Sequence, residues 1–445
     1  MIKPAHPKKL NSSNKFTVLA HVDKSFVPAG LLNITETGSE ITASQFAYGL
    51  RYINRPNALE VDPVSLSFTL DRSALRGQQL VPAEGLAIFG AVRDAMPDAW
   101  GRRVIESALN APLNGLPETA YLRYPAAERV GALEFTQGSI TESNKESNKA
   151  AIKTVTLHRL EYLKEAADRV EQGLPVPSQL EDIFVAGTSL GGMRPKATVV
   201  DENGVLWLAK FRAHGEKLDV PAIEAATLKL AADAGLHVSS VRTVEISGAL
   251  GKQSVMLIKR FDRAGTSDDV QRIHMVSALT MLSCNEWQSR DKSYGEIADV
   301  IRRKAHPIAI ANQCEELFGR MIFNILVHND DDHLRNHAFL YETDATTHAA
   351  YWHLSPLYDV MPRATVATER FLHLGIGAQG RAATITNAMS IYARFGLTKA
   401  TAEHIIDRIW RVVREWKQRF EGYGVAGSEI GKISTAFRHI DLLTN

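Results

Sequence analysis

Hydrophobic and polar residues alternate in short segments along the first two thirds of the chain, which predicts strands. In residues 205–211 the alternation places Trp207 and Phe211 on one face of a strand, while Leu208 and Lys210 share the other. Because that second face is otherwise apolar, Lys210 is expected to line a pocket. Further strands are predicted at residues 16–21, 66–70, 196–200, 241–247, 254–261, 337–341 and 349–354.

Apolar residues recur with helical spacing in other segments. Helices are predicted at residues 87–109, 157–172, 221–235, 317–326 and 401–420. Ser178 and Glu181 have the spacing of a capping box, a weak indication of a helix start. The helix at 221–235 carries Glu224. In the helix at 401–420 one flank collects arginines, which is typical of a solvated face.

The order of these elements predicts an α+β protein in three parts. Residues 1–150 form a mixed α/β unit, and within it residues 141–150 are polar and unpatterned, which favours a linker or exposed loop. Residues 151–270 contain a glycine-rich segment, most of the later strands and one helix. Residues 271–445 are mainly helical.

Composition narrows the classes of protein further. Net charge is +1 over 445 residues, which gives no whole-chain case for binding nucleic acid. The two cysteines, Cys284 and Cys314, lack metal-ligand spacing and indicate a reducing, cytoplasmic setting. Neither a signal peptide nor a membrane-spanning apolar run is expected.

The densest chemistry lies in residues 327–337, directly after a predicted helix. Asp331 and Asn336 are five residues apart, and Asp359 follows the next predicted hairpin. A carboxylate can orient a hydroxyl proton, and further oxygen ligands suit magnesium. A polar turn that caps a helix would use the same residue types. The roles of Asp330 and Asp332 stay open, and an EF-hand is excluded because its glycine and glutamate are missing.

The glycine-rich segment at residues 186–195 is a candidate phosphate loop. Gly187 and Gly192 lack the Lys-Ser/Thr of a Walker A motif, so any phosphate contact would come from backbone amides and from the Ser189 hydroxyl. A flexible surface loop would have the same composition. His333 and His337 lie four residues apart, but no third zinc ligand accompanies them.

The order of parts favours a kinase over these separate explanations. A glycine-rich loop, a lysine strand and a glutamate helix are followed by a hairpin, a helical region, Asp-x4-Asn and a further Asp. Lys210 and Glu224 then correspond to the ion pair that holds the α- and β-phosphates of a nucleotide.

At these positions the chain resembles the HipA family of bacterial toxin kinases. Residues 331–336 resemble the catalytic loop of that family, and residues 355–360 its metal-binding segment. Residues 258–263 resemble the arm between its lobes, and residues 185–196 its phosphate loop. The resemblance extends over essentially the whole chain, with weaker motifs in the N-terminal part.

The resemblance implies a two-lobed, protein-kinase-like fold that uses ATP and Mg²⁺. It implies Asp331 as the catalytic base and Asn336 with Asp359 as the metal ligands. It places the cofactor against residues of the phosphate loop, the lysine strand, the arm and the catalytic loop: Gly187, Ser189, Gly192, Lys210, Glu224, Arg260, Phe261 and His333.

The family also implies partners and regulation. The expected partners are a serine-bearing protein substrate, in some members an aminoacyl-tRNA synthetase, and a small helix-turn-helix antitoxin that brings the toxin to operator DNA. Some members phosphorylate a serine just before the phosphate loop. Here that position is Phe184, so Thr188 or Ser189 would have to substitute.

Two other functions remain compatible with the sequence. One is a small-molecule kinase of the aminoglycoside or sugar type, which shares the same catalytic layout. The other is a catalytically silent regulator that acts through a DNA-binding partner.

Overall fold

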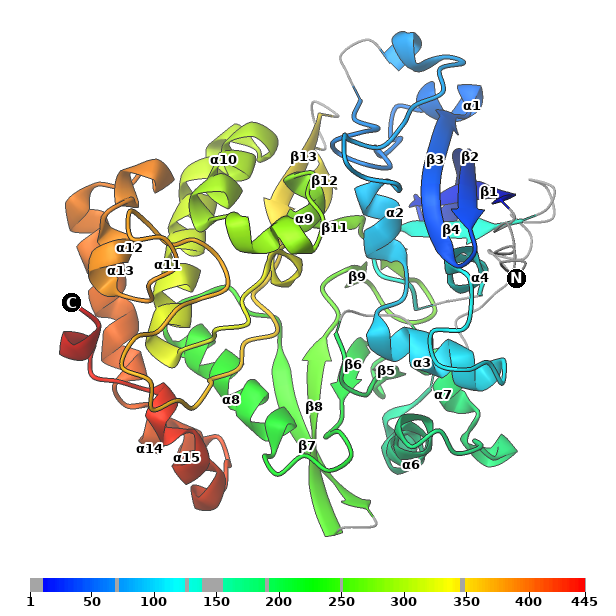
Figure 1. Ribbon diagram of the computed structural model, residues 1–445. Coiled ribbons are helices and arrows are strands. Elements are labelled where there is room, and N and C mark those ends of the chain that lie inside the picture. Colours follow the sequence, from blue (N-terminus) through cyan, green and yellow to red (C-terminus); the bar gives the residue numbers. More distant parts are fainter. Residues whose placement is uncertain are drawn as a thin grey trace, which may run out of the picture.

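A computed structural model describes residues 11–68, 72–124, 128–137, 155–188, 192–248, 251–344 and 349–444. The expected linker at residues 141–150 and Ser189 lie outside these ranges. The fold is mixed α/β. Figure 1 shows strands through the middle and one end of the molecule, with the helices of the C-terminal third gathered at the opposite end.

The first sheet is antiparallel in the order β3-β2-β1-β4. Its strands are β1 (Asn11–Val22), β2 (Ser25–Thr37), β3 (Glu40–Tyr48) and β4 (Leu133–Thr136). β1 confirms the strand expected at residues 16–21. The strand expected at residues 66–70 is wrong for residues 66–68, where the Asp62 carboxylate accepts from the amides of Val64 and Ser65 and so bends the chain into a turn.

Four short helices accompany this sheet. They are α1 (Leu50–Ile53), α2 (Gly90–Ala95), α3 (Ala99–Ala108) and α4 (Glu118–Arg123). The single helix expected at residues 87–109 is broken, because Pro97 cannot continue α2 and the Asp98 side chain caps α3 by accepting from the Gly101 amide. In Figure 1, α2 and α3 lie between the first sheet and the second.

The second sheet is antiparallel in the order β5-β6-β8-β7. Its strands are β5 (Lys196–Val200), β6 (Leu206–Lys210), β7 (Val241–Gly248) and β8 (Gly251–Lys259). On one side lie α6 (Leu160–Glu171) and α7 (Asp182–Ala186), and on the other lies α8 (Val220–Asp233). These elements confirm the predictions from residue 157 to residue 261, apart from the capping box.

The alternation predicted for β6 is confirmed by the two cores. Trp207 and Phe211 pack with α6 and α7 in one hydrophobic cluster, whereas Leu208 packs against the larger core that contains α8. Lys210 shares the Leu208 face. The capping box expected at Ser178 does not form, and the structure has one at Ser293 and Glu296 instead.

The rest of the chain is mainly helical. A three-stranded sheet has the order β11-β12-β13, with β11 (Met275–Ser277), β12 (Ala338–Thr343) and β13 (Ala350–Leu354), and two residue pairs form β9 (Arg263–Ala264) and β10 (Gln271–Arg272). The helices are α9 (Ala278–Met281), α10 (Tyr294–Lys304), α11 (Ile310–Val327), α12 (Ile385–Met389), α13 (Lys399–Val413), α14 (Trp416–Gly422) and α15 (Gly427–Ile433).

The last long helix expected at residues 401–420 is two helices, α13 and α14, separated at Arg414 and Glu415. Its predicted apolar face is nevertheless buried throughout, because α14 continues to present Trp416 and Phe420 to the core. Short 3₁₀ helices complete the chain: Arg72–Leu75, Leu157–Arg159, Ser178–Leu180, Trp287–Asp291, Pro307–Ala309, Leu334–Asn336, Tyr392–Phe395, Ser434–Ala436 and Ile440–Leu443.

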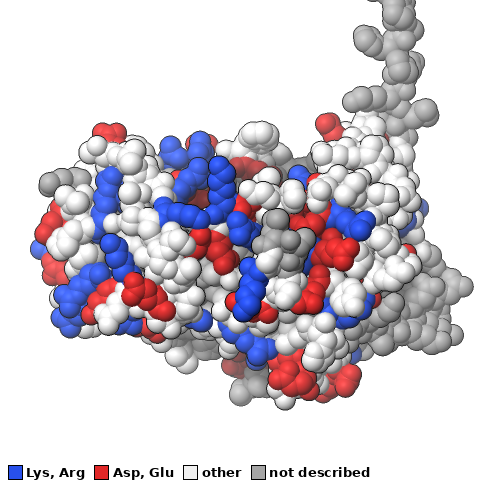
Figure 2. Space-filling view, turned by 90° about the horizontal axis from the view of Figure 1, so that it is seen from below, with Lys and Arg blue, Asp and Glu red and all other residues white. Residues whose placement is uncertain are grey.

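Charges are mixed on the surface seen in Figure 2. Lys and Arg side chains alternate with Asp and Glu across that face, in keeping with a net charge of +1. In the part of the chain that the structure describes, the helices are too short or too polar to cross a membrane.

Candidate functional site

A pocket of about 630 Å³ lies where the second sheet meets the catalytic loop. Leu208 and Lys210 of β6 and Ile258 of β8 form one wall, and His333 and Asn336 of the catalytic loop form another. Gly192, Phe261 and Asp359 also line it. The structure therefore brings residues from the glycine-rich segment, the lysine strand, the arm and the catalytic loop to one cavity.

Lys210 is the centre of the charged end of this pocket. Its ammonium nitrogen lies 2.6 Å from Glu224 Oε1 and 2.8 Å from Asp359 Oδ1. Glu224 comes from the second turn of α8, which packs on β7 and β8, and its side chain is buried. Asp359 is the open member of the three, because its side chain is 38% exposed.

Asp359 adopts a backbone conformation that non-glycine residues rarely adopt. Its φ is +60°, in the left-handed region, which costs a non-glycine residue about 1–2 kcal/mol. Such strain persists where the surrounding structure holds it, and it is common at ligand sites. The strain aims the carboxylate at Lys210.

The charges of this cluster fix its protonation. Burial opposes ionisation of Asp359, but the Lys210 ammonium outweighs it and lowers the pKa of Asp359 to about 2. Burial raises the pKa of Glu224, and the neighbouring Asp359 adds to this. For Lys210, burial is outweighed by Asp359 and Glu224, so its pKa lies above the usual range. At neutral pH the cluster holds an ionised Asp359 beside a charged lysine.

The catalytic loop is held by its own hydrogen bonds. Helix α11 ends at His328, which takes the left-handed conformation at φ +53°. The Asn336 amide donates to the Asp331 carbonyl oxygen at 2.9 Å, and the His333 backbone amide donates to the same oxygen at 2.9 Å. Asn336 is buried, whereas Asp331 is exposed. The loop thus presents the Asp331 carboxylate to solvent from a fixed backbone.

Asp332 and Asp330 take different positions, which the sequence had left open. Asp332 is buried and accepts from the Tyr294 hydroxyl, and one of its oxygens lies 3.0 Å from His337 Nε2. Burial raises the pKa of Asp332, but His337 outweighs it and lowers that pKa below its ordinary value. Asp330 lies 3.4 Å from Arg363. Asp332 therefore holds the loop onto α10 through its hydrogen bond with Tyr294.

The other end of the pocket is apolar. Along β6, Leu208 lies one inward-facing position before Lys210, and it pairs with Ile258 of β8. Beyond Ile258 the chain reaches Phe261, whose ring lies 5.5 Å from that of Tyr358. The pocket therefore runs from charged groups at Lys210 to aromatic and aliphatic groups at Phe261, a layout that suits a flat ring carrying an anionic tail.

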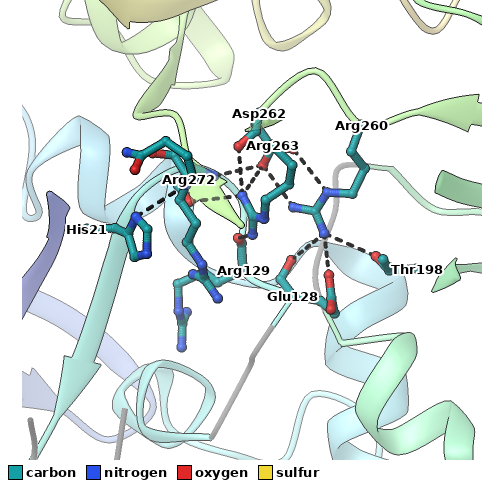
Figure 3. A network of polar contacts seen from close by, with 10 residues as sticks. His21, Glu128, Arg129, Thr198, Arg260, Asp262, Arg263 and Arg272 are labelled. Carbon is teal, nitrogen blue, oxygen red and sulfur yellow. Dashed lines mark hydrogen bonds and ion pairs between the residues drawn. The ribbon is translucent and has the colours of Figure 1, made fainter. Parts of the chain in front are cut away.

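Arg260 is among the residues that line the pocket, and its guanidinium belongs to a buried polar network (Figure 3). It contacts Glu128 Oε2 at 2.6 Å, Asp262 Oδ2 at 2.8 Å and Thr198 Oγ1 at 3.1 Å. We call residues 258–263 the hinge and this set of contacts the hinge network. Arg263 joins the network through Asp262.

The glycine-rich segment is described on both sides of residues 189–191. Gly187 and Thr188 follow α7, and Gly192 precedes β5. Gly192 has φ +113°, and a Cβ there would lie 3.1 Å from Lys196 Nζ. Lys196 in turn pairs with Asp98 at 2.9 Å.

The first turn of α3 packs on this segment, which sequence reasoning missed. A Cβ at Gly101 would come within 2.5 Å of the Thr188 carbonyl oxygen, and the Trp100 amide donates to the Gly192 carbonyl. Residues 93, 94 and 96–99 also line the pocket. Met96-Pro97-Asp98 carries a helix-stop and a helix-start signal, from which the break between α2 and α3 could have been predicted. These signals do not predict that the break lies beside the pocket.

The residues at the charged end fit a hard cation. Asn336 and Asp359 supply amide and carboxylate oxygens, and Mg²⁺ is commonly held by one or two such groups together with phosphate oxygens. Within the described ranges, no group of three or more His, Cys, Asp or Glu side chains is arranged to hold a metal. His337 is directed at Asp332 rather than grouped with His333 for zinc.

Comparison with known proteins gives a family and a fold. Residues 188–416 match the HipA-like C-terminal domain. A chain from the Shewanella oneidensis MR-1 toxin–antitoxin complex of HipA, HipB and operator DNA aligns with a TM-score of 0.61 and 16% identity over 95% of both chains. The Helicobacter pylori proinflammatory kinase CtkA aligns with a TM-score of 0.39 and 13% identity, over 57% of this chain and 92% of that one. No curated protein matches the sequence.

The family match covers more than half of the 445 residues and runs from before β5 to the first residue of α14, with Lys210, Glu224, Asp331, Asn336 and Asp359 inside it. The alignment with the Shewanella chain extends the shared fold to the N-terminal sheet as well. The chain belongs to the HipA family, through its HipA-like C-terminal domain.

Proposed function

We propose that the protein is an ATP-dependent serine/threonine-protein kinase and the toxin of a HipA-type toxin–antitoxin system. In this proposal the second sheet and α8 belong to an N-terminal lobe within residues 151–270, and residues 271–445 form a helical C-terminal lobe. Residues 1–150 are the family's N-terminal subdomain. The protein acts in the cytoplasm on a protein target, for which an aminoacyl-tRNA synthetase is the first candidate.

One observation carries the kinase proposal. Lys210 bridges Glu224 and Asp359 at 2.6 and 2.8 Å inside a pocket that Asn336 also lines. Residues from four separate segments meet there in the order and chemistry that phosphoryl transfer uses. An ion pair with only a structural role would not require Asp359 to be partly exposed and to adopt a left-handed backbone conformation.

The residues have distinct roles in this proposal. Lys210 neutralises the α- and β-phosphates, and Glu224 holds its ammonium in place. Asn336 and Asp359 would hold Mg²⁺, which when bound neutralises charge on the phosphates. Asp331 accepts the proton of the acceptor hydroxyl while that oxygen bonds to the γ-phosphorus, the bond from the γ-phosphorus to the bridging oxygen breaks, and ADP leaves. The apolar end at Phe261 and Tyr358 takes the adenine ring.

The test is transfer of label from γ-labelled ATP to protein, with Asp331→Asn against wild type. Asparagine keeps the shape of the side chain but cannot accept the proton, so we expect the rate to fall by about two to four orders of magnitude. Asp407→Asn is the control, because Asp407 is an exposed residue of α13 that pairs only with Arg411 across one turn. Equal labelling by wild type and Asp331→Asn would overturn the assignment.

The destination of the label separates the remaining alternatives. Label in a small-molecule fraction, and not in protein, indicates a small-molecule kinase. A protein that turns over no ATP, but shifts operator DNA when a helix-turn-helix partner is added, is a silent regulator.

The toxin proposal rests on the family and on the fold shared with the Shewanella chain, which was solved with HipB and operator DNA. We expect induced expression of wild type to arrest growth and Asp331→Asn to leave growth normal. Co-expression of a helix-turn-helix protein encoded beside this chain should restore growth. Equal arrest by both forms would separate toxicity from phosphoryl transfer.

A further inference from the structure

Two of the side chains that bind the Arg260 guanidinium, those of Glu128 and Thr198, lie more than 60 positions away from it in sequence. All three nitrogens of the Arg260 guanidinium donate hydrogen bonds, to Asp262, to Glu128 and to Thr198 of β5. The Arg260 and Glu128 side chains are 1% and 4% exposed. No other pair of side chains ties the residues just before β4 to the hinge at such short range in the described structure.

A second set of contacts joins the same two segments through the backbone. Asp262 Oδ2 accepts from the Gly131 amide at 3.0 Å. Arg263 donates to the carbonyl oxygens of Arg129 at 2.6 Å and Gly131 at 3.2 Å. Figure 3 shows these groups converging from the loop before β4 and from the end of β8. Residues 128–131 and 260–263 therefore move together or not at all.

The hinge backbone in turn bounds the apolar end of the pocket. The Arg260 amide donates to the Leu206 carbonyl oxygen at 3.0 Å, which fixes the hinge to the end of β6 opposite Lys210. Phe261 and Val130 line the cavity on either side of the network. A change in the network is thus transmitted to the base-binding end and leaves the phosphate-binding end untouched.

We propose that Glu128 and Arg260 form a positioning pair through which the segment before β4 sets the recognition of the nucleotide base at the hinge. The proposal rests on the kinase function and names what controls base selectivity at that site. Arg260 acts by holding the backbone of the hinge, because its guanidinium nitrogens are already hydrogen-bonded to Asp262, Glu128 and Thr198.

Charge explains why the pair is sensitive. Arg260, Arg263 and Arg272 are all buried, and Asp262 with Glu128 supplies the compensating carboxylates. Neutralising Glu128 leaves an uncompensated cation in a site with little access to water, where unpaired charge is strongly disfavoured. We expect the Arg260 side chain then to rearrange, and the hinge backbone with it.

The experiment compares Glu128→Gln with Glu134→Gln. Glu134 lies on β4 and pairs with buried Arg129 at 3.2 Å, so it controls for loss of a partly buried, paired carboxylate in the same region without contact with Arg260. Equilibrium titration with ATP and with GTP, each with Mg²⁺, gives the ratio of the two dissociation constants. We expect Glu128→Gln to reduce the preference for ATP over GTP about tenfold, because displaced pocket contacts lose discrimination on that scale. We expect Glu134→Gln to leave the preference unchanged.

Turnover provides a second readout that a general loss of stability would not move. In Glu128→Gln the KM for ATP should rise about tenfold while kcat stays within about twofold, because the groups at Lys210 keep their places. Thr198→Val, which removes only the 3.1 Å contact, should shift the ratio in the same direction by less. If Glu128→Gln does not fold, the Thr198→Val variant still tests the proposal.

The outcomes separate the inference from the function on which it rests. If wild type binds neither nucleotide, the kinase proposal fails. If wild type binds ATP, and both Glu128→Gln and Thr198→Val keep its base preference, the hinge network only stabilises the fold and the inference is overturned. An equal loss in Glu128→Gln and Glu134→Gln overturns it as well.

Discussion

Two buried clusters of charge stand at opposite ends of the pocket, and they differ in how completely they are closed. In the hinge network, Arg260, Glu128 and Asp262 have side chains no more than 4% exposed, and Arg260 is bonded through all three of its nitrogens. At the charged end, Asp359 is 38% exposed and strained at φ +60°. The first arrangement is closed to solvent, and the second is partly open to it.

The difference teaches how to tell a supporting cluster from a reactive one. Both contain strongly interacting charges, and in each the pKa of an aspartate is lowered against the effect of burial, by Arg260 and Arg263 at Asp262 and by Lys210 at Asp359. A shifted pKa is therefore shared by both ends. Exposure and backbone strain are found at only one, and they favour that end as the site of the proposed chemistry.

The largest effect is expected from Asp359→Asn. Asparagine tolerates the left-handed conformation and leaves Lys210 paired with Glu224, so the free energy of unfolding should change by less than about 1 kcal/mol. Phosphoryl transfer should fall by about a thousandfold or more, because a metal ligand is lost. Urea unfolding and a labelled-ATP assay measure both. A protein that loses stability and keeps activity would reverse the comparison.

The matching change at the hinge is Asp262→Asn. It leaves Arg260 and Arg263 buried with one carboxylate fewer, and breaking a buried pair in this way costs about 3–5 kcal/mol of unfolding free energy. Urea unfolding of the variant beside Asp359→Asn tests the contrast directly. If the two variants have the same stability, the closed and the open cluster do not differ in what they contribute to the unfolding free energy.

The predicted order of parts was right where local pattern decides the structure. Alternation placed Lys210 on the pocket face of β6, and a proline start with a glycine stop placed Glu224 on α8. The same local rules put a capping box at Ser178, but the box forms at Ser293, where the same Ser-x-x-Glu spacing occurs. Only tertiary packing distinguishes the two positions.

What the sequence could not predict comes from long-range contacts. Arg260 was expected beside the adenine because the hinge is there, but its partner Glu128 lies 132 residues earlier. No periodicity connects two such positions. The left-handed backbone of Asp359 is equally invisible in the sequence, since aspartate occurs there only when its surroundings enforce it.

The folded molecule should lose stability on the hinge side as pH falls below 6.5. His21 hydrogen-bonds the Arg272 amide, and burial with Arg272 and Arg263 nearby lowers its pKa from 6.5 to about 4. The unfolded chain takes up the proton first, so stability is complete above pH 6.5 and is lost as pH falls toward 4. The expected loss is about 3 kcal/mol.

Thermal unfolding between pH 7 and pH 4 measures this slope in wild type and in His21→Asn. His274 has a pKa lowered to about 4 by burial, so it contributes a similar slope that persists in the variant. We expect the variant to show a shallower dependence, not a flat one. Identical slopes in both proteins would show that His21 does not contribute to the pH dependence of stability.

The smallest effect is expected from Lys24→Ala. Lys24 pairs with Asp269 at the same junction between the N-terminal sheet and the residues after the hinge, but the two side chains are 55% and 63% exposed. Exposed pairs contribute about 0–1 kcal/mol, so the variant should unfold within about 0.5 kcal/mol of wild type. A loss as large as that of Asp262→Asn would show that closeness to the junction, and not burial, sets the energy.

The separation of Glu128 from Arg260 also has a consequence during synthesis. The loop before β4 leaves the ribosome first, and 132 positions separate it from its partner. At about 5–20 residues per second, Glu128 and Arg129 wait roughly 7–26 s before the hinge arginines exist. Until then the hinge end of the pocket cannot form, so a nascent chain of this kinase candidate has no complete pocket while its C-terminal part is still being made.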